Sequence, residues 1–592
     1  MKLSYIYSDQ PFKEVKFKNG FNVILGKVTK PSDKSKDSHN LGKTTLIYVI
    51  DFMLLKDFGE GQFLYDFKEK FLEYTFYLEI LLNNGAYLTI KRSVKTNTKI
   101  SFKIHGSHYQ DYRNETKWDH YELTLKKAKQ TLNDYLNFNV LTNYNYRKVV
   151  SYFLRTQDDY LDVFQLNKYS NSKHVDWKPL LFEMLGFNGK YLTDKYDIDE
   201  EIENLKTFIG NIEKKTDTNS EEVDKIKGLI ELKEEEKINI RKYVDDFKFY
   251  KEELKLNTDL VDRIERKISK LNTWRYNLEF EIDQINSSMS NKIDFDMDQI
   301  ETLFKEVKIY FPDALKKSYS NLVEFNKQLY EERSKHLEER LKQVKEQYKN
   351  IQHELEKMDD KRSQILSVLK DENSFSKYKH YQEQLINVEA ELVNLKNQLK
   401  GVNEINSLND AITTLEEKND KIKNEIKKHI VGNENKIYPL IRRNFNQIVK
   451  NIIYSPALIS LKINQQGNIE FDASIQNSDQ TTITAKGKGT TYRKFLCMAF
   501  DLSILIAYNE RSFFKFVYHD GAFEALDDRK KINFIKTARD ICKKYDLQYI
   551  LTTIEDDLPR DEHDNVINFD KDELALTLSD EGDEGRLFEM SF

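Results

Sequence analysis

Two long proline-free segments are the feature that most constrains the fold of this 592-residue chain. The chain has seven prolines, and none lies between Pro179 and Pro312 or between Pro312 and Pro439. Proline removes a backbone hydrogen bond from a helix interior and clashes with the preceding turn, so such gaps permit long helices. Both segments are rich in Glu and Lys, which suits helices with solvated faces.

An apolar residue recurs about every 3.5 positions in both segments. The first segment carries Val261, Ile264, Ile268, Leu271, Leu278, Ile282 and Ile285. The second carries Leu337, Leu341, Val344, Tyr348, Ile351, Leu355, Met358 and Ile365, and the rhythm resumes from Leu385. This spacing keeps one apolar stripe facing a partner helix and is typical of a coiled coil. Two amphipathic helices of an ordinary bundle are the alternative.

The two segments are of similar length and flank a short irregular piece. We therefore expect an antiparallel hairpin with one arm over 191–293, an apex over 294–330 containing Pro312, and a second arm over 331–432. An arm of about 110 residues would reach at most ~165 Å at 1.5 Å per residue. The stretch TDTNSEE near Thr216 lacks apolar seam residues and is expected to interrupt the first arm.

Outside the arms the sequence predicts a mixed α/β structure. The strand-like runs TFYLEILL and AYLTIKRSV flank Gly85, and ISLKI and NIEFDASI flank Gly467, which indicates two hairpins. The runs KFVYHD and QYILTTI read as buried strands separated by a helix. The predicted α/β domain, a head, combines residues 1–190 with residues 433–592.

Composition and charge exclude several classes of protein. Cys497 and Cys542 cannot form a disulfide framework and have no metal-ligand spacing. No stretch approaches the roughly 20 apolar residues that span a bilayer, and the start lacks a signal-peptide layout, so we expect a cytoplasmic protein without membrane contact. The net charge is −6, but residues 1–190 carry +8 and residues 551–592 carry −11. The basic part suits phosphate or nucleic acid, whereas the acidic end opposes such contacts or is simply solvated.

A glycine-containing loop lies between a predicted strand and an apolar helix near the start of the chain. In P-loops of this order, backbone N–H groups cradle phosphate, the lysine (here Lys43) reaches the β and γ phosphates, and the following hydroxyl (Thr44) holds Mg²⁺. Gly26 and Gly42 are sixteen positions apart instead of about five, so a chance Gly-Lys-Thr is the alternative. The candidate nucleotide-binding residues are Gly26, Asn40, Gly42, Lys43, Thr44 and Thr45.

A P-loop at one end predicts an acidic residue that closes an apolar strand near the other end and holds Mg²⁺. The sequence KFVYHDGAFEALDD supplies Asp520 at such a position. A turn aspartate without a metal is the alternative.

This organisation resembles the SMC-like branch of the ABC ATPases, which includes chromosome-maintenance and recombination-repair proteins. More narrowly, NxGKTT after a long insertion, YFLRTQDDYLDVF and HDGxFExLDDR resemble the YydD-like bacterial family of unknown function, linked to three-component anti-phage cassettes. The resemblance implies an ABC-type P-loop ATPase head with a coiled-coil hairpin inserted, and ATP and Mg²⁺ as cofactors. It also implies a homodimer through the heads, contact with DNA, and further subunits of a defence or DNA-processing complex, including a nuclease effector.

The resemblance assigns roles to two further residues of the N-terminal half. Gln157, in LRTQDD, resembles the Q-loop glutamine that contacts Mg²⁺ and the attacking water; an ordinary surface glutamine is the alternative. Arg92, at the end of a strand, is expected either to face phosphate or to be a solvated strand-end arginine.

In the C-terminal half, the loop that opens the helix YRKFLCMAFDLSIL corresponds to the family's signature motif, which contacts nucleotide bound to a second head. Its residues are Gly487, Gly489 and Thr490, although the usual Ser-Gly-Gly is absent. A glycine-rich loop before a core helix is the alternative. Asp527 matches the D-loop aspartate that touches the opposing head.

The sequence departs from the ABC pattern at the catalytic positions. Gly521 occupies the place of the catalytic glutamate, and Thr552-Thr553-Ile554-Glu555 contains no switch histidine. Either hydrolysis is slow, or His519 or Glu524 substitutes as the base. Two hypotheses follow: an SMC-like ATPase that acts on DNA, or a coiled-coil scaffold or sensor that binds ATP without useful turnover and gates a partner effector.

Overall fold

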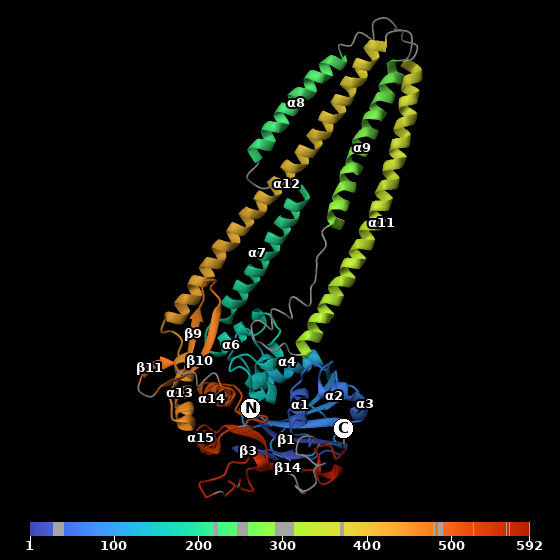
Figure 1. Cartoon of the computed structure of the whole chain (residues 1–592). Coiled ribbons are helices and arrows are strands. Elements are labelled where there is room, and N and C mark those ends of the chain that lie inside the picture. Colours follow the sequence, from blue (N-terminus) through green and yellow to red (C-terminus); the bar gives the residue numbers. More distant parts are fainter. Residues whose placement is uncertain are drawn as a thin grey trace. The chain divides into compact units, whose positions relative to one another are not determined.

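The computed structural model of the chain forms two compact units, which are described separately (Figure 1). The first, here called the head, comprises residues 1–202 and 414–592; the second, here called the arms, comprises residues 203–413. The structure describes residues 1–27, 41–216, 223–245, 258–290, 313–366, 372–477, 480–483, 489–524, 526–563, 565–567 and 569–590.

A five-stranded parallel sheet in the head combines strands from both ends of the chain. Its order is β14-β3-β13-β12-β8. The strands are β3 (Phe21–Lys27), β8 (Leu154–Arg155), β12 (Phe516–His519), β13 (Gln548–Ile554) and β14 (Leu574–Ser579). Parallel sheets are covered on both faces, which explains the continuous apolar runs of β3, β12 and β13. The prediction of an α/β head built from both ends of the chain is confirmed.

Two antiparallel sheets complete the β structure of the head that the structure describes. The larger has the order β2-β1-β4-β5-β6-β7, with β1 (Lys2–Ser8), β2 (Val15–Lys16), β4 (Thr75–Leu81), β5 (Tyr87–Ser93), β6 (Lys99–His105) and β7 (His120–Thr124). The smaller has the order β11-β10-β9, with β9 (Ala457–Ile463), β10 (Ile469–Asn477) and β11 (Gln480–Ile483). Gly85 and Gly467 have positive φ in the two predicted hairpin turns, as tight hairpins require.

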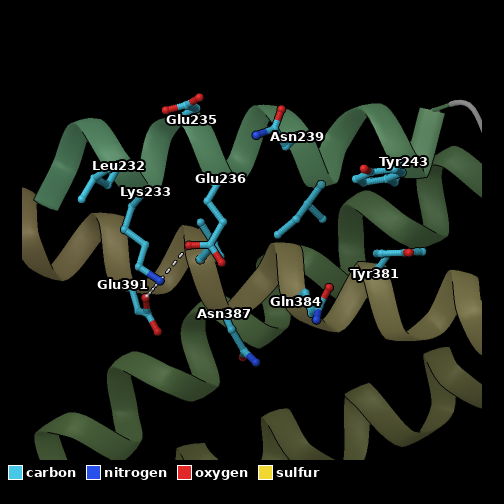
Figure 2. Close-up of a pocket in the computed structure, with 12 residues that line it drawn as sticks. Leu232, Lys233, Glu235, Glu236, Asn239, Tyr243, Tyr381, Gln384, Asn387 and Glu391 are labelled. Atoms are coloured by element: carbon cyan, nitrogen blue, oxygen red, sulfur yellow. Dashed lines mark ion pairs between the residues drawn. The ribbon is translucent and has the colours of Figure 1, made fainter.

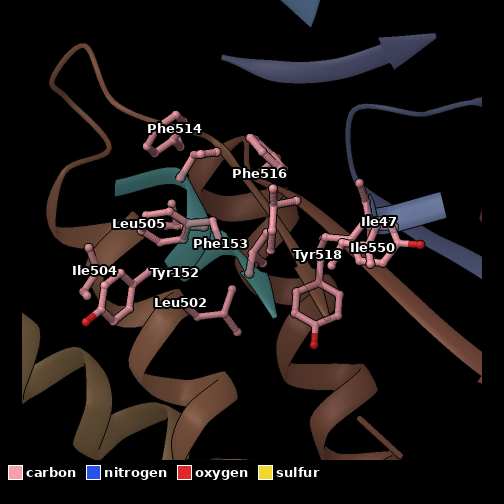
Figure 3. Packing of buried hydrophobic residues seen from close by; sticks show 14 of the residues in the cluster. Ile47, Tyr152, Phe153, Leu502, Ile504, Leu505, Phe514, Phe516, Tyr518 and Ile550 are labelled. Atoms are coloured by element: carbon pink, nitrogen blue, oxygen red, sulfur yellow. The ribbon is translucent and has the colours of Figure 1, made fainter. Parts of the chain in front are cut away.

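The helices of the head pack around these sheets. They are α1 (Lys43–Met53), α2 (Phe63–Asp66), α3 (Lys68–Phe71), α4 (Leu125–Tyr135), α5 (Tyr146–Val149), α6 (Lys178–Met184), α13 (Ile437–Ile453), α14 (Thr490–Ala507) and α15 (Asp528–Tyr545). Figure 3 shows how buried residues from both halves meet in one core: Phe153 from the N-terminal half lies among Leu505, Phe514 and Phe516 from the C-terminal half. Fully burying one such side chain stabilises the fold by about 1.5–3 kcal/mol, so each half gains stability from the residues of the other.

The arms are built from long helices, as the apolar repeat predicts. These are α7 (Gly189–Thr216), α8 (Val223–Asp245), α9 (Thr258–Ser290), α11 (Asp313–Leu366) and α12 (Glu372–Val431); α7 and α12 extend into the head. Seam residues of α9 and α11 are buried against one another, among them Ile268, Leu271 and Leu355. No helix in the described ranges is long and apolar enough to cross a membrane.

Helix α8 packs on α12 through an apolar seam flanked by ion pairs. Figure 2 shows this surface, with Lys233 between Glu391 of α12 and Glu236 of its own helix. The rings of Tyr243 and Tyr381 stack with centroids 5.5 Å apart. A groove beside these contacts is lined by both helices.

The residue numbers of the paired helices show that they are antiparallel with a common centre. Lys233 pairs with Glu391, Glu281 with Arg340, and Asp199 with Asn419. The means of these paired numbers are 312, 310.5 and 309. A single hairpin that turns near residue 312 would have this register throughout, which supports the predicted antiparallel arms.

The structure changes the predicted apex and the predicted boundary between the head and the arms. The predicted apex, 294–330, is too long on its C-terminal side, because α11 begins at Asp313 and nothing in the following sequence breaks a helix; residues 294–312 lie outside the described residues. The interruption near Thr216 coincides with the end of α7. The head also takes in the roots of both arms, where Lys195 Nζ lies 2.8 Å from Asn468 Oδ1 of the β9–β10 turn.

The antiparallel register predicts which positions cross-link. In a Tyr243→Cys/Tyr381→Cys variant, a short bismaleimide is expected to join the two cysteines, because the native rings stack. The two native cysteines are buried and should not compete. Efficient joining shows as altered mobility on a denaturing gel. A Tyr243→Cys/Glu354→Cys variant is the control, because Glu354 pairs with Lys267 instead; equal cross-linking of both variants would contradict the register.

Candidate nucleotide site

The strand β3 and the helix α1 build a P-loop-like corner at the edge of the parallel sheet. Gly42 caps α1 with φ 96°, a left-handed conformation that favours glycine. A Cβ atom on Gly26 would lie 3.0 Å from the Lys43 ammonium, so glycine at this position lets the lysine lie against the strand end. Thr44 and Thr45 are half-buried in the first turn of α1, whose N–H groups favour anions. Asn40 lies outside the described residues.

Asp520 follows β12 and faces this corner from the C-terminal half. Burial raises its pKa, against the opposing effects of the Thr552 and Thr44 hydroxyls and the Lys43 ammonium. Thr552 donates a hydrogen bond to Asp520 Oδ1 and accepts one from the Gly521 N–H, at 2.9 Å. The other oxygen, Asp520 Oδ2, is buried without a hydrogen-bond partner among the described residues.

The unpaired Asp520 oxygen fits a divalent cation. Mg²⁺ takes oxygen ligands, often one or two from protein together with phosphate oxygens, and Asp520 and Thr44 can supply them. Among the described residues, at this corner or elsewhere, no group of three or more His, Cys, Asp or Glu side chains could hold a metal ion. Asp520 and Thr44 are therefore candidate ligands of such a cation.

Gln157 and Glu524 meet above Gly521. Gln157 opens a 3₁₀ turn after β8, and its Nε2 donates a 2.6 Å hydrogen bond to Glu524 Oε1. Gly521 has φ 60°, and a Cβ atom there would lie 2.5 Å from Gln157 Cγ. A side chain at position 521 would therefore need a strained backbone and a shift of Gln157, and a carboxylate enters the site from three residues further on.

These residues surround one small cavity. Its lining includes Lys43 from the N-terminal strand–helix corner, Gln157 from the turn after β8, and Gly521, Glu524 and Thr552 from the C-terminal half. Lys43 and Asp520 also lie near each other, since the Lys43 ammonium lowers the Asp520 pKa, although the two residues are 477 positions apart in the sequence. A lysine, a glutamine and a carboxylate thus line one cavity.

His519 belongs to the core and does not face the cavity. Its Nδ1 lies 2.6 Å from the Tyr549 hydroxyl, and its Nε2 lies 3.0 Å from Asp501, which also pairs with the buried Arg155. Burial lowers the pKa of His519, against the effect of Asp501. Because both ring nitrogens are engaged in the core, the contacts of His519 do not support the alternative in which it acts as the base.

Arg92 faces neither phosphate nor solvent, so both assignments made from the sequence are wrong. The side chain is fully buried, its guanidinium lies over the Phe52 ring, and Nη1 donates to the carbonyls of Phe52 and Lys56 at 2.5 and 2.8 Å. Burial lowers its pKa to about 9. Arg92 therefore satisfies carbonyl groups at the C-terminal end of α1.

The residues assigned to a second head lie on the surface or outside the described residues. Gly489 is exposed and caps α14, and Thr490 is the first residue of that helix, whereas Gly487 lies outside the described residues. Asp527 is exposed, caps α15 and pairs with Arg529 at 3.3 Å. Gly489 and Asp527 are therefore accessible at two helix N-termini of the head.

Two contributors were missed by reasoning from the sequence. In the sequence, Thr552 stands only where a switch histidine is absent. The parallel register of β12 and β13 pairs His519 with Leu551 and so places Thr552 beside Asp520. Lys494 of α14 donates to the carbonyl oxygens of Gly521 and Glu524 at 3.3 and 3.1 Å. Nothing in the sequence spacing indicates that contact.

Comparisons with known proteins find a family model over part of the chain and solved structures of low sequence identity. A family model described as "Uncharacterised protein conserved in bacteria (DUF2326)" matches residues 448–592, and no curated protein matches. Among solved structures, a Smc head domain with a coiled coil and joint from Pyrococcus yayanosii is 13% identical, with TM-score 0.33 over 93% of this chain and 92% of that one.

Two further solved structures are similar to the same degree. The Smc head domain with an extended coiled coil from Pyrococcus furiosus, bound to the C-terminal domain of ScpA, is 11% identical, with TM-score 0.31 over 94% and 90%. A SmcHead bound to the C-winged helix domain of ScpA is 9% identical, with TM-score 0.34 over 94% and 90%. Residue roles are therefore assigned from the contacts of this chain.

The burial of Asp520 predicts a stability gain when its charge is removed. The pKa of Asp520 is higher in the folded state than in the unfolded state. The free energy of unfolding therefore falls as pH rises from the ordinary Asp pKa through the raised pKa. Asp520→Asn should therefore raise the melting temperature at pH 7, without nucleotide or Mg²⁺, by about 2 °C, and the gain should shrink as pH falls.

Differential scanning fluorimetry at several pH values measures this effect. Asp527→Asn is the matched control, because the pairing of exposed Asp527 with Arg529 lowers its pKa and its removal should bring no gain. An equal gain in both variants would contradict a burial cost at Asp520.

Proposed function

We propose that this chain is an SMC-like protein that binds ATP with Mg²⁺ in its head and hydrolyses it. The observation that carries the proposal is that Lys43 and Gln157 line one cavity, while Asp520 lies near enough for the Lys43 ammonium to lower its pKa. Lys43 and the N–H groups of α1 would bind the phosphates. Asp520 and Thr44 would hold Mg²⁺, which would neutralise phosphate charge.

Glu524 is proposed as the general base. A base must lie within hydrogen-bond reach of the attacking water, and Glu524 reaches the cavity through its hydrogen bond with Gln157. In this arrangement Gln157 positions both the carboxylate and the water. The Glu524 carboxylate, held by Gln157, would take the role of the glutamate that is missing at position 521.

Two heads are proposed to close on ATP. Gly489 at the start of α14 and Asp527 at the start of α15 are exposed, as residues that contact a second head must be. ATP would favour the closed pair only by binding it more tightly than separate heads. Closure would change the arms or a partner's access to DNA, and the resemblance to the YydD-like family suggests a bacterial anti-phage complex with further subunits.

A second candidate is a coiled-coil scaffold or sensor that binds ATP without useful turnover and gates a partner effector. Gly521 at the place of the catalytic glutamate favours it. In this case Glu524 would only hold Gln157 in place. The two candidates agree on nucleotide binding and differ in turnover.

Phosphate release by the full chain, with and without DNA, distinguishes the two candidates. The Lys43→Ala variant is expected to lose ATP binding and sets the blank. Glu524→Gln keeps a hydrogen-bonding group beside Gln157 but removes the base, so turnover should fall about 100-fold while ATP affinity stays within about threefold.

Asp557→Asn is the matched control, because Asp557 lines the same cavity. Its turnover should stay close to that of the unmodified chain. Turnover of the unmodified chain equal to the Lys43→Ala blank would favour the scaffold, and absence of ATP binding would refute both candidates.

A further inference from the structure

The acidic end of the chain folds back onto the nucleotide corner. Strand β14 pairs in parallel with β3, so the chain runs beside the strand that leads into the P-loop-like corner. A 3₁₀ turn over Asp583–Gly585 follows, and Gly585 packs closely against the Ser579 carbonyl. Residues 580–590, here called the C-terminal segment, thereby return to the start of α1.

Leu587 links this segment to the two residues before α1. Its N–H donates a 3.0 Å hydrogen bond to the Leu41 carbonyl, and its own carbonyl accepts one of 2.8 Å from Lys13. The side chain is fully buried, and its Cβ lies 2.6 Å from where a Cβ atom of Gly42 would be. The left-handed Gly42 is therefore packed directly against Leu587.

Phe588 anchors the C-terminal segment in the core of the head. Its ring lies 4.8 Å from that of Phe71, 5.3 Å from that of Phe12 and 5.7 Å from that of Tyr74, measured between centroids. Aromatic pairs at such distances contribute about 0.5–1.5 kcal/mol each beyond their buried area. The neighbouring Leu587 is thus held at a fixed place.

The long connection before α1 explains why such a support is useful. Gly26 and Gly42 are sixteen positions apart, and a longer connection restricts its ends less than a short one. A phosphate-binding corner gains affinity when its N–H groups are already in place, because less ordering is needed on binding. Leu587 restricts Leu41 and Gly42 from outside the loop.

We propose that the C-terminal segment is part of the nucleotide site and that Leu587 is a positioning residue for the triphosphate. This inference rests on the proposed function. The segment holds Gly42, and through it the first N–H groups of α1 and Lys43, in the conformation that binds phosphate. The two unusual features of the sequence, the long insertion and the C-terminal segment, are thereby related.

Affinity for ATP and Mg²⁺, measured by calorimetry on the full chain, tests the proposal. Leu587→Ala should raise the dissociation constant about tenfold, and Leu587→Met, which keeps the volume, should restore it to within about twofold. Leu547→Ala is the matched control: Leu547 is equally buried but precedes β13, at the end of that strand away from the site. An equal loss of affinity in both alanine variants would overturn the proposal, since it would reflect general destabilisation.

Hydrogen exchange in the nucleotide-free chain separates this inference from the proposed function. Leu587→Ala should speed exchange of the amides of residues 41–46, and Leu547→Ala should not. Unchanged exchange at these amides would overturn the positioning role even if the chain binds ATP. If the unmodified chain binds no ATP, the proposed function fails. Faster exchange in Leu587→Ala but not in Leu547→Ala would still show that the C-terminal segment restrains residues 41–46.

Discussion

The pairing of β3 with β13, and of β13 with β12, is the interaction on which the candidate site depends. It leaves only β13 between β3, which leads into the corner, and β12, which Asp520 directly follows. Parallel strands present their carboxyl ends at one edge of a sheet, so Lys43 and Asp520 meet there. Lys43 belongs to the N-terminal half and Asp520 to the C-terminal half, so the candidate site exists only where the two halves pair.

The same edge explains the unusual position of the second carboxylate. Gly521 turns with positive φ directly beneath Gln157, so a glutamate side chain there would strain the backbone and displace Gln157. Glu524 reaches Gln157 instead, and the carbonyl oxygens of residues 521 and 524 are held by Lys494. Because Lys494 belongs to α14, the helix that begins at Gly489, the turn bearing Glu524 is connected to the surface proposed to meet a second head.

The roots of the arms are attached to the head by buried polar contacts. Lys195 of α7 is almost fully buried and bonds both Asp199 and Asn468, and Asn419 of α12 donates to Asp199. Buried charged groups are costly unless they are paired, so these contacts fix the two roots relative to the β9–β10 turn. Farther out, the antiparallel register of the arms depends on apolar seams flanked by exposed ion pairs, each worth little.

Local patterns in the sequence were sufficient for the long helices, the hairpins at Gly85 and Gly467, the buried strands and the composition of the nucleotide corner. These features depend on periodicity and on the chemistry of neighbouring residues. The role of Arg92, the core position of His519, the approach of Glu524 and the packing of Leu587 on Gly42 were decided only by the tertiary structure. Each of these depends on which side chains meet across hundreds of residues, because burial and hydrogen-bond partners are set by packing and not by spacing along the chain.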